Sequence, residues 1–202
     1  MYKLVVFILA LLPALVLFGL ASFGQLGPDP GKELVLNTGI LALYFLLSTL
    51  AVTPFHRWFG WKRLVGYRRM MGLYSFFYAS LHFLLVGQFL LGWSLAIFAE
   101  EFQERPYMAL GMSAWLLMLP LALTSNRRAM KALKQYWKRL HRLVYVIAVL
   151  VAGHYLWQIR SDFFEPVFYS VLLMFLLLSR INTLGRAALS FQRLSPKVES
   201  KV

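Results

Sequence analysis

Two of the four histidines in this chain lie deep inside long apolar segments, at similar distances from clusters of basic residues. His82 follows Arg69 by 13 residues, which is about 20 Å of helix, and His154 follows Arg142 by 12 residues, or about 18 Å. An ionisable side chain in the interior of a bilayer is costly and commonly functional. Two imidazoles at one depth suit a planar metal macrocycle held from both faces, so this spacing predicts a haem b with two histidine ligands.

Other interpretations of this histidine pair stay open. Buried histidines can be neutral and hydrogen-bonded to neighbouring hydroxyl or carbonyl groups, or they can relay protons in a transporter. Small residues near both imidazoles favour the macrocycle because they leave room for it; these residues are Ser75, Ala79, Ala152 and Gly153.

The other two histidines lie near the ends of predicted helices. His141 stands at the start of the fifth apolar segment and is either the ligand of a second haem or no ligand at all. His141 and His154 are about 20 Å apart along a straight helix and cannot bind one iron together. His56 follows Pro54, where we expect the second helix to end in a loop, and it is predicted to have no ligand role.

The elements that must position these histidines are membrane helices. The chain has 202 residues of which 60% are hydrophobic, which is too many for one water-soluble core. Six stretches are long enough, or nearly so, to cross about 30 Å of hydrocarbon as helix. They cover approximately residues 4–23, 34–53, 70–92, 107–124, 143–159 and 166–182. The sequence predicts an all-α integral membrane protein, with one six-helix domain over residues 1–202 and a first helix that is retained rather than cleaved.

Charge is distributed unevenly along the chain, whose formal net charge is +13. Eighteen of the 21 basic residues fall at the termini and in alternate connections: Lys3, Arg57, Lys62, Arg63, Arg68, Arg69, Arg127, Arg128, Lys131, Lys134, Lys138, Arg139, Arg142, Arg180, Arg186, Arg193, Lys197 and Lys201. The other connections hold Lys32, Arg105 and Arg160 with seven of the eight acidic residues: Asp29, Glu33, Glu100, Glu101, Glu104, Asp162 and Glu165. Because connections rich in Lys and Arg stay on the cytoplasmic side of a membrane, both termini are predicted to be cytoplasmic. Attraction to anionic lipid explains the remaining basic excess, and no nucleic-acid partner is expected.

Cysteine is absent from the chain. Its absence excludes disulfides, thiolate catalysis, covalently attached haem and cysteine-ligated iron–sulfur clusters. No internal repeat is visible, and the connections are too short for a nucleotide-binding domain. If the protein moves electrons, its donor and acceptor must therefore be other chains.

Several motifs between residues 54 and 157 resemble those of a known family. They are GYRRMMGLY at 66–74, YASLH at 78–82, RPYMALG at 105–111, LTS at 123–125, WKRLHRLVY at 137–145 and HYLW at 154–157. Together they resemble the MsrQ family, formerly YedZ, within the ferric reductase-like transmembrane domains. The resemblance implies a haem b subunit of the bacterial inner membrane, with FMN as a further cofactor. It implies electron transfer from quinol or a cytoplasmic flavin reductase to a periplasmic molybdopterin methionine sulfoxide reductase, for repair of oxidised proteins.

The chain departs from the wider superfamily, whose members commonly carry two histidines on each of two helices. Its third segment has His82 alone, and the position 14 residues earlier is Arg68, which cannot ligate iron at ordinary pH. An inner haem on His141 would need another axial ligand or remain five-coordinate. Alternatively, Arg68 and Arg69, with the basic segment 127–142, bind the phosphate of FMN, or they contact lipid only.

Two other functions also remain open. One is a self-contained transmembrane reductase of quinone or ferric ions, and the other is a haem-free transporter that uses its histidines. If the electron-transfer interpretation holds, the acidic segment 100–105 offers a complementary surface to a periplasmic partner.

Overall fold

The computed structural model describes residues 2–159 and 163–194, with side chains described up to residue 180. Of the charged residues assigned to connections above, Arg160, Asp162, Lys197 and Lys201 lie outside the described residues, as do the side chains of Arg186 and Arg193. In the described part every regular element is a helix. The predicted all-α class is therefore confirmed there.

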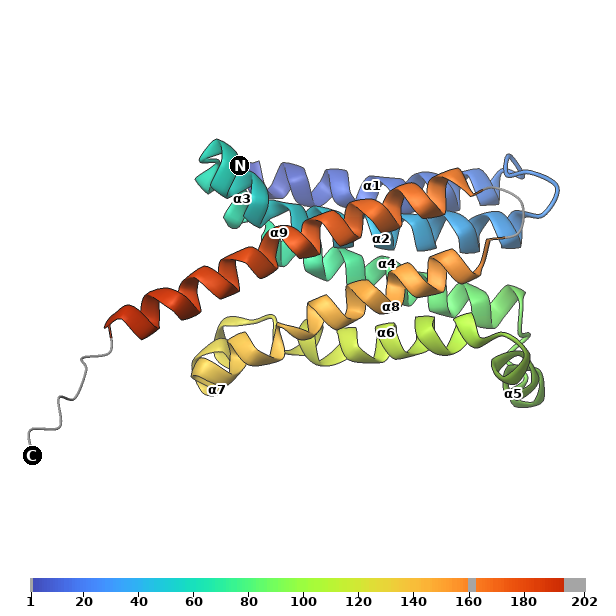
Figure 1. Cartoon of the computed structure of the whole chain (residues 1–202). Helices are drawn as coiled ribbons and strands as arrows, with labels where there is room; N and C mark the ends of the chain where they lie inside the picture. The colour runs from blue at the N-terminus through green and yellow to red at the C-terminus, as the bar shows by residue number, and fades with distance from the viewer. Residues whose placement is uncertain (1, 160–162, 195–202) are drawn as a thin grey trace, which may run out of the picture.

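The helices form a bundle with short helices across its two ends. The elements are α1 (Tyr2–Ser22), α2 (Pro30–Phe59), α3 (Lys62–Val65), α4 (Arg68–Phe89), α5 (Leu95–Glu104), α6 (Pro106–Leu123), α7 (Arg127–Leu140), α8 (Leu143–Trp157) and α9 (Phe164–Leu194). In Figure 1, α1, α2, α4, α6, α8 and α9 run along a common direction, with α3 and α7 at one end and α5 at the other. Helix α1 begins and α9 ends at the α3 and α7 end.

Four helices, α1, α2, α4 and α6, are long and apolar enough to cross a membrane. Helices α7 and α8 meet at a bend of 48° and supply a fifth crossing if the pair is one span. The sixth predicted span falls within α9. The protein is thus a multi-pass membrane protein, while the count of six spans and the side on which the termini lie stay predictions.

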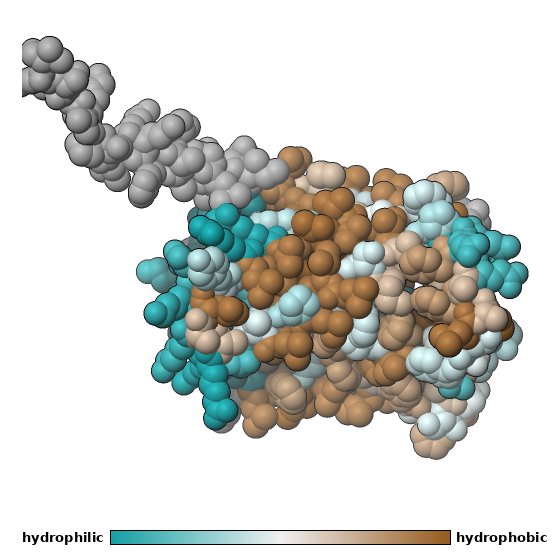
Figure 2. All heavy atoms as spheres, turned by 90° about the horizontal axis from the view of Figure 1, so that it is seen from below, coloured by the Kyte–Doolittle hydropathy of each residue, from teal (hydrophilic) through white to brown (hydrophobic). Residues whose placement is uncertain are grey.

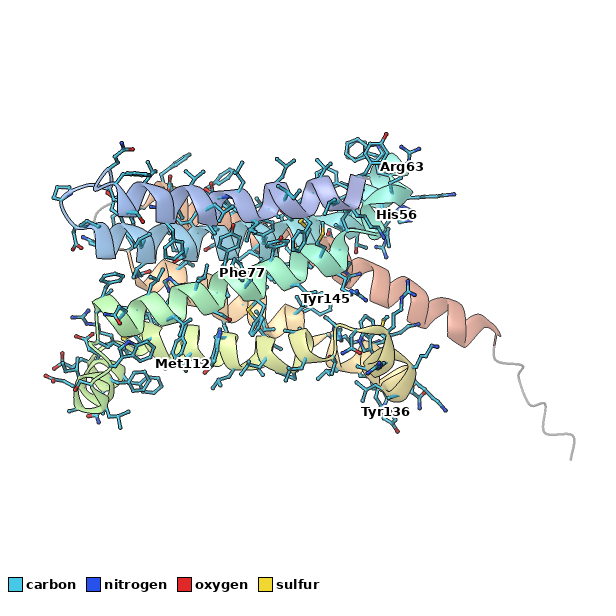
Figure 3. The ribbon with its side chains drawn as sticks, turned by 180° about the vertical axis from the view of Figure 1, so that it is seen from behind. His56, Arg63, Phe77, Met112, Tyr136 and Tyr145 are labelled. Atoms are coloured by element: carbon cyan, nitrogen blue, oxygen red, sulfur yellow. The ribbon has the colours of Figure 1, made fainter. Side chains whose placement is uncertain are left out.

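The two ends of the bundle differ in charge. The α3 and α7 end, called the basic end below, carries Arg57, Lys62, Arg63, Arg68, Arg69 and the cations of α7. The α5 end, called the acidic end, carries Asp29, Glu33, Glu100, Glu101, Glu104 and Glu165. Figure 2 shows apolar side chains over the length of the bundle and polar side chains gathered at both ends. In Figure 3, His56, Arg63 and Tyr136 all lie at the basic end, with His56 and Arg63 on one side of the bundle and Tyr136 on the opposite side.

Helix α2 continues through Pro54 and ends at Phe59, so the predicted end at this proline is wrong and His56 is helical. Proline has no N–H to donate to the carbonyl group of Leu50 one turn earlier. That carbonyl accepts a hydrogen bond from Nη2 of Arg180 instead, at 2.6 Å. The helix ends at Gly60, whose φ of 69° suits glycine.

Two segments that the sequence analysis treats as loops are helices. The acidic segment 100–105 belongs to α5, whose first turn is capped by the Ser94 hydroxyl. The basic segment 127–142 forms α7, capped by the Asn126 side chain and kinked at Lys134, where φ is 46°. Both helices are short and polar on one side, which is why an apolar-run criterion does not find them.

The described core lies where α2, α6, α8 and α9 meet. Leu50, Ile147, Ala148 and Leu173 are almost fully buried there. A second cluster joins α1 and α2 to α4 through the buried rings of Tyr74 and Tyr78. These contacts hold α2, α4, α6 and α8 around a cavity that contains the histidine pair.

Candidate functional site

A cavity of about 560 Å³ lies between α2, α4, α6 and α8, and both His82 and His154 line it. Its walls are mainly aliphatic and aromatic, and they include the stacked rings of Phe83 and Trp115, whose centroids are 4.7 Å apart. The cavity reaches the acidic end, where Glu101 and Arg105 are among its lining residues. The volume falls within the range of binding sites for small molecules and cofactors.

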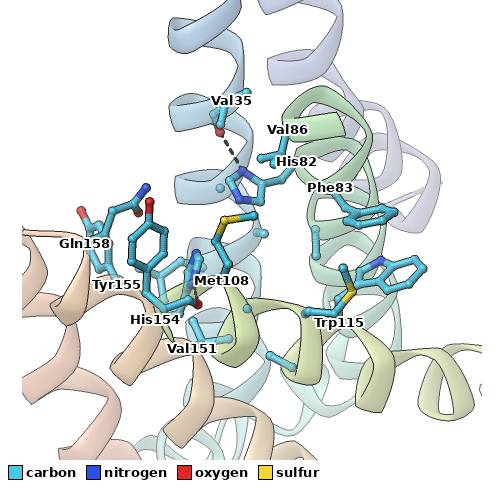
Figure 4. Close-up of a pocket in the computed structure, with 18 of the residues that line it drawn as sticks. Val35, His82, Phe83, Val86, Met108, Trp115, Val151, His154, Tyr155 and Gln158 are labelled. Carbon is cyan, nitrogen blue, oxygen red and sulfur yellow. Dashed lines mark hydrogen bonds between the residues drawn. The ribbon is translucent and has the colours of Figure 1, made fainter. Parts of the chain in front are cut away.

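The two imidazoles approach each other from different helices, His82 from α4 and His154 from α8 (Figure 4). Their ring centroids are 6.3 Å apart and their planes are inclined by 82°. The structure therefore brings together the two residues whose matched depth was predicted from their spacing along separate helices.

Each imidazole is oriented by a backbone carbonyl of the neighbouring helix. His82 Nδ1 lies 2.8 Å from the Val35 carbonyl oxygen, and His154 Nδ1 lies 2.7 Å from that of Tyr107. A carbonyl oxygen only accepts hydrogen bonds, so Nδ1 is the protonated nitrogen in both rings. The lone pair of each Nε2 is then available to a ligand, which is the usual tautomer of metal-binding histidine.

A glycine one turn after each carbonyl admits the imidazole. A Cβ atom at Gly39 would lie 3.0 Å from His82 Nδ1, and one at Gly111 would lie 2.8 Å from His154 Nδ1. Such contacts are too close for any other residue without movement of the ring. Close packing of the imidazole on the helix backbone thus depends on glycine at both positions.

The two histidine environments are copies of one arrangement. The carbonyl-to-histidine separation is 47 residues in both, and each glycine is four residues after its carbonyl. The unit formed by α2 and α4 therefore recurs as α6 and α8, with both units contributing a histidine to one cavity. This repeat is not visible in the sequence because the repeated residues are few and are separated by unrelated apolar sequence.

The expectation that small residues make room beside both imidazoles is correct for His82 and wrong for His154. Ser75 and Ala79 line the cavity near His82. Ala152 and Gly153 are not among its lining residues, and the expectation that they make room beside His154 is wrong. The space there comes from Gly111 on the neighbouring helix.

His141 lies outside this cavity, near the basic end. Its ring stacks on Trp137 with centroids 3.9 Å apart, and Nδ1 lies 3.1 Å from the Trp137 carbonyl oxygen. Its Nε2 is buried and has no hydrogen-bond partner. The third histidine is therefore protonated at the same ring nitrogen as the pair, but its carbonyl acceptor lies one turn earlier in its own chain segment.

The two arginines proposed for phosphate binding differ in their surroundings. Arg68 is half-buried and interacts electrostatically with Arg180, Tyr145 and His141. Arg68 is thus within electrostatic range of His141, whereas Arg69 is exposed.

At the acidic end, one ion pair lies beside the cavity. Arg105 Nε is 2.8 Å from a Glu101 carboxylate oxygen. A hydrogen bond with the Tyr107 side chain, with smaller contributions from Glu101 and Glu104, raises the pKa of Arg105. This arginine is therefore a permanent cation at the acidic end of the cavity.

Comparison with known proteins identifies the family. The ferric reductase like transmembrane component family matches residues 38–152. The chain is 46% identical over 155 residues to the protein-methionine-sulfoxide reductase heme-binding subunit MsrQ of Xanthomonas euvesicatoria pv. vesicatoria, which covers 75% of this chain and 70% of that protein. With the same coverage, it is 46% identical over 153 residues to the protein of that name from Xanthomonas campestris pv. campestris, and 45% identical over 155 residues to that from Xanthomonas oryzae pv. oryzae. No solved structure matches the chain. The chain belongs to the MsrQ family of heme-binding subunits, within the ferric reductase like transmembrane components.

Proposed function

We propose that this protein is an electron-transfer subunit that holds one haem b between His82 and His154. The observation that carries the proposal is the matched orientation of the two rings. Both Nδ1 atoms are bound to carbonyl oxygens of neighbouring helices, and the ring centroids are 6.3 Å apart. Two metal–nitrogen bonds of about 2 Å, with roughly 1 Å more to each ring centre, require a centroid separation of about 6 Å.

The cavity also fits a macrocycle better than a bare metal ion. Among the residues that the structure describes, no group of three or more His, Cys, Asp or Glu side chains is placed to hold a metal. Two histidines alone leave most coordination positions of a transition metal to be filled. A porphyrin supplies these positions in a plane, and the apolar walls of the cavity suit its faces.

A bound haem would supply reversible one-electron chemistry. The protein sets the conditions for it. With His82 and His154 holding it from both sides, a bound haem would have no open position for oxygen or substrate, which would favour electron transfer over oxygen binding. The Val35 and Tyr107 carbonyls fix the ring orientation, while the aliphatic and aromatic walls exclude water from the centre of the bundle.

We also propose a second cofactor near the basic end. The buried Nε2 of His141 carries no proton, as in the histidine pair, and is available to a second haem. FMN is the other proposed cofactor, with Arg68 nearer to the buried cluster than Arg69. Electrons would enter here from quinol or a cytoplasmic flavin reductase, since a basic surface attracts an acidic or phosphorylated donor.

The acidic end is the proposed contact with a periplasmic molybdopterin methionine sulfoxide reductase, across the bacterial inner membrane. Glu100 and Glu104 are exposed on α5, whereas Glu101 is half-buried and paired with Arg105. Docking should therefore depend on Glu100 and Glu104 more than on Glu101. Charge complementarity acts mainly on the encounter rate and is screened by salt.

Stopped-flow spectroscopy tests this function. The reduced protein is mixed with the purified reductase, and reoxidation of the haem band is followed. We expect rapid reoxidation by the partner, and slower reoxidation at low ionic strength when Glu100 and Glu104 are both changed to lysine. The matched control reverses Lys62 and Arg63 to glutamate at the basic end and should leave the rate unchanged.

Three results would contradict the proposal. A purified protein without a Soret band would favour a haem-free transporter. Reduction of quinone or ferric ions by the protein alone, without reoxidation by the partner, would favour a self-contained reductase. Equal rates for the Glu100→Lys, Glu104→Lys variant and its parent at low salt would show that these two residues do not form the docking surface.

A further inference from the structure

Arg180 is a buried cation in the middle of α9, with 6% of its surface exposed. Its Nη2 atom donates to the Leu50 carbonyl at 2.6 Å. That carbonyl has no backbone donor in α2, because Pro54 lacks an N–H. The Nη1 atom of Arg180 donates to the Tyr145 hydroxyl at 3.3 Å. These bonds explain why an arginine is tolerated inside the bundle, because they satisfy part of its hydrogen-bonding capacity.

The same bonds leave the positive charge of Arg180 without a counter-ion. The Arg180 Nε atom is buried and has no hydrogen-bond partner. Of the carboxylates in the part of the chain that the structure describes, Glu165 is the nearest to Arg180 in the sequence, and it lies in the first turn of α9, about 22 Å of helix before Arg180. A buried cation that has neutral partners alone is unfavourable relative to one paired with an anion.

A second cation, Arg68, adds to the uncompensated positive charge around Arg180. Arg68, the first residue of α4, is half-buried and interacts electrostatically with both Arg180 and Tyr145. Two arginines that repel each other inside a protein are stabilised by an anion between or beside them. The Tyr145 hydroxyl accepts a hydrogen bond from Arg180, so its own proton remains available to such an anion.

We infer that Arg68, Arg180 and Tyr145 form a binding site for an oxyanion, either a phosphate or a carboxylate, carried by a ligand that enters from the basic end. Guanidinium groups match both oxyanions through paired N–H donors. Three helices, α4, α8 and α9, supply the three side chains. The site is separate from the cavity of His82 and His154 and does not depend on the proposed haem there, but it extends the proposed second cofactor at the basic end by adding Arg180 and Tyr145 to Arg68.

Inorganic phosphate is the probe for this site. The full-length protein is purified in a neutral detergent, and its thermal midpoint is measured in sodium phosphate and in sodium chloride at equal ionic strength. A ligand that binds only the folded state raises the midpoint. We expect phosphate to stabilise the parent protein, and the apparent dissociation constant to rise about tenfold or more in Arg68→Gln and in Arg180→Lys.

The two variants test different parts of the site, and a third variant is the control. Arg180→Lys keeps the positive charge beside Leu50 and removes the Nε donor. Arg68→Gln removes the second charge and leaves the hydrogen bond between Arg180 and Leu50 in place. It therefore tests the site if Arg180→Lys does not fold. Arg63→Gln removes an exposed arginine at the same end and should bind phosphate as the parent does.

Analysis of the co-purified ligands identifies the source of the oxyanion. Loss of flavin in both site variants would indicate the phosphate of a flavin nucleotide, and loss of anionic phospholipid would indicate a lipid phosphate. Loss of part of the haem, with the low-spin haem signal kept, would indicate the carboxylate of a second macrocycle. If both variants bind phosphate like Arg63→Gln and retain flavin, lipid and haem in full, the site does not exist.

Discussion

At the scale of single residues, the orientation of each imidazole is determined by the backbone of a neighbouring helix. The carbonyl groups of Val35 and Tyr107 accept from Nδ1, and Gly39 and Gly111 allow each ring to lie against the helix that supplies the carbonyl. The glycines are therefore the positions at which a mutation can displace the rings without removing a ligand.

The glycine contacts lead to the first prediction at this scale. Changing Gly39 or Gly111 to alanine should displace the imidazole and lower haem occupancy, with the larger effect at Gly111, where the added Cβ would be closer. Overpacking of this kind costs about 1–3 kcal/mol. Haem content per protein and the low-spin signal are the measurements.

Gly72→Ala is the matched control for this experiment. Gly72 also lies in α4, but a Cβ there would meet the Thr49 side chain at an ordinary 3.7 Å. It should leave haem content unchanged. If Gly111→Ala keeps full haem occupancy and an unaltered spectrum, the close packing of the ring on α6 has no role in binding.

The histidine pair could be predicted from the sequence because depth along a helix is simple arithmetic once the apolar segments are recognised. The carbonyls and glycines could not, because they lie on other helices and depend on how α2 packs on α4 and α6 on α8. The error at Ala152 and Gly153 has the same origin. Those residues adjoin His154 in the chain, but the room beside its ring belongs to Gly111.

At the scale of elements, α1 is attached to the rest of the bundle by two tyrosines of α4. The Tyr74 hydroxyl donates to the Phe7 carbonyl at 2.8 Å, and the Tyr78 hydroxyl donates to that of Ala10 at 2.7 Å. The Tyr78 oxygen also accepts from the Ala14 amide at 3.3 Å, so it is inserted into the hydrogen-bond ladder of α1. These contacts support the prediction that α1 is a retained part of the fold.

Removal of the Tyr78 hydroxyl should loosen α1. We expect Tyr78→Phe to lower the free energy of unfolding in mixed detergent micelles by about 0.5–1.5 kcal/mol, because the bonded hydroxyl is completely buried. Tyr136→Phe on α7, where the ring is 58% exposed, is the control. Equal stabilities for the two variants would show that this hydroxyl does not attach α1.

The bounds of α1, α4, α6 and α8 could be predicted within three residues. Helix α2 extends to Phe59 and α9 to Leu194, beyond the predicted ends at 53 and 182, and the short helices α5 and α7 were not predicted. Apolar runs identify the long helices, and a cap or a proline marks many of their ends, as Asp29 and Gly60 do for α2. The short helices have few apolar residues and many charges, so they resemble loops. Ser94 and Asn126 were the available signals, since both are favourable residues at the start of a helix.

At the scale of the whole molecule, two related helix pairs surround one cavity, and the two ends of the bundle carry opposite charge. Helix α4 contributes His82 and α2 its carbonyl partner; α8 contributes His154 and α6 its carbonyl partner, in equivalent positions. Cations are concentrated at the α3 and α7 end, and carboxylates at the α5 end. The positive-inside rule then predicts a basic end in the cytoplasm.

Cysteine labelling tests this orientation directly, because the chain has no cysteine of its own. Gln103 on α5 and Gln135 on α7 are both exposed and uncharged, which makes them a matched pair. A membrane-impermeant maleimide should label Gln103→Cys in intact spheroplasts, and Gln135→Cys only after the membrane is opened. Labelling of both positions from one side, or in the reverse order, would contradict the proposed orientation.

The central claim is that His82 and His154 hold one haem from its two faces. Low-temperature electron paramagnetic resonance of the purified oxidised protein tests it most directly, with His56→Ala as the control. We expect a low-spin signal typical of two histidine ligands in the parent and the control, and its loss in both His82→Ala and His154→Ala. A full haem content with an unchanged low-spin signal in either of these two variants would contradict it.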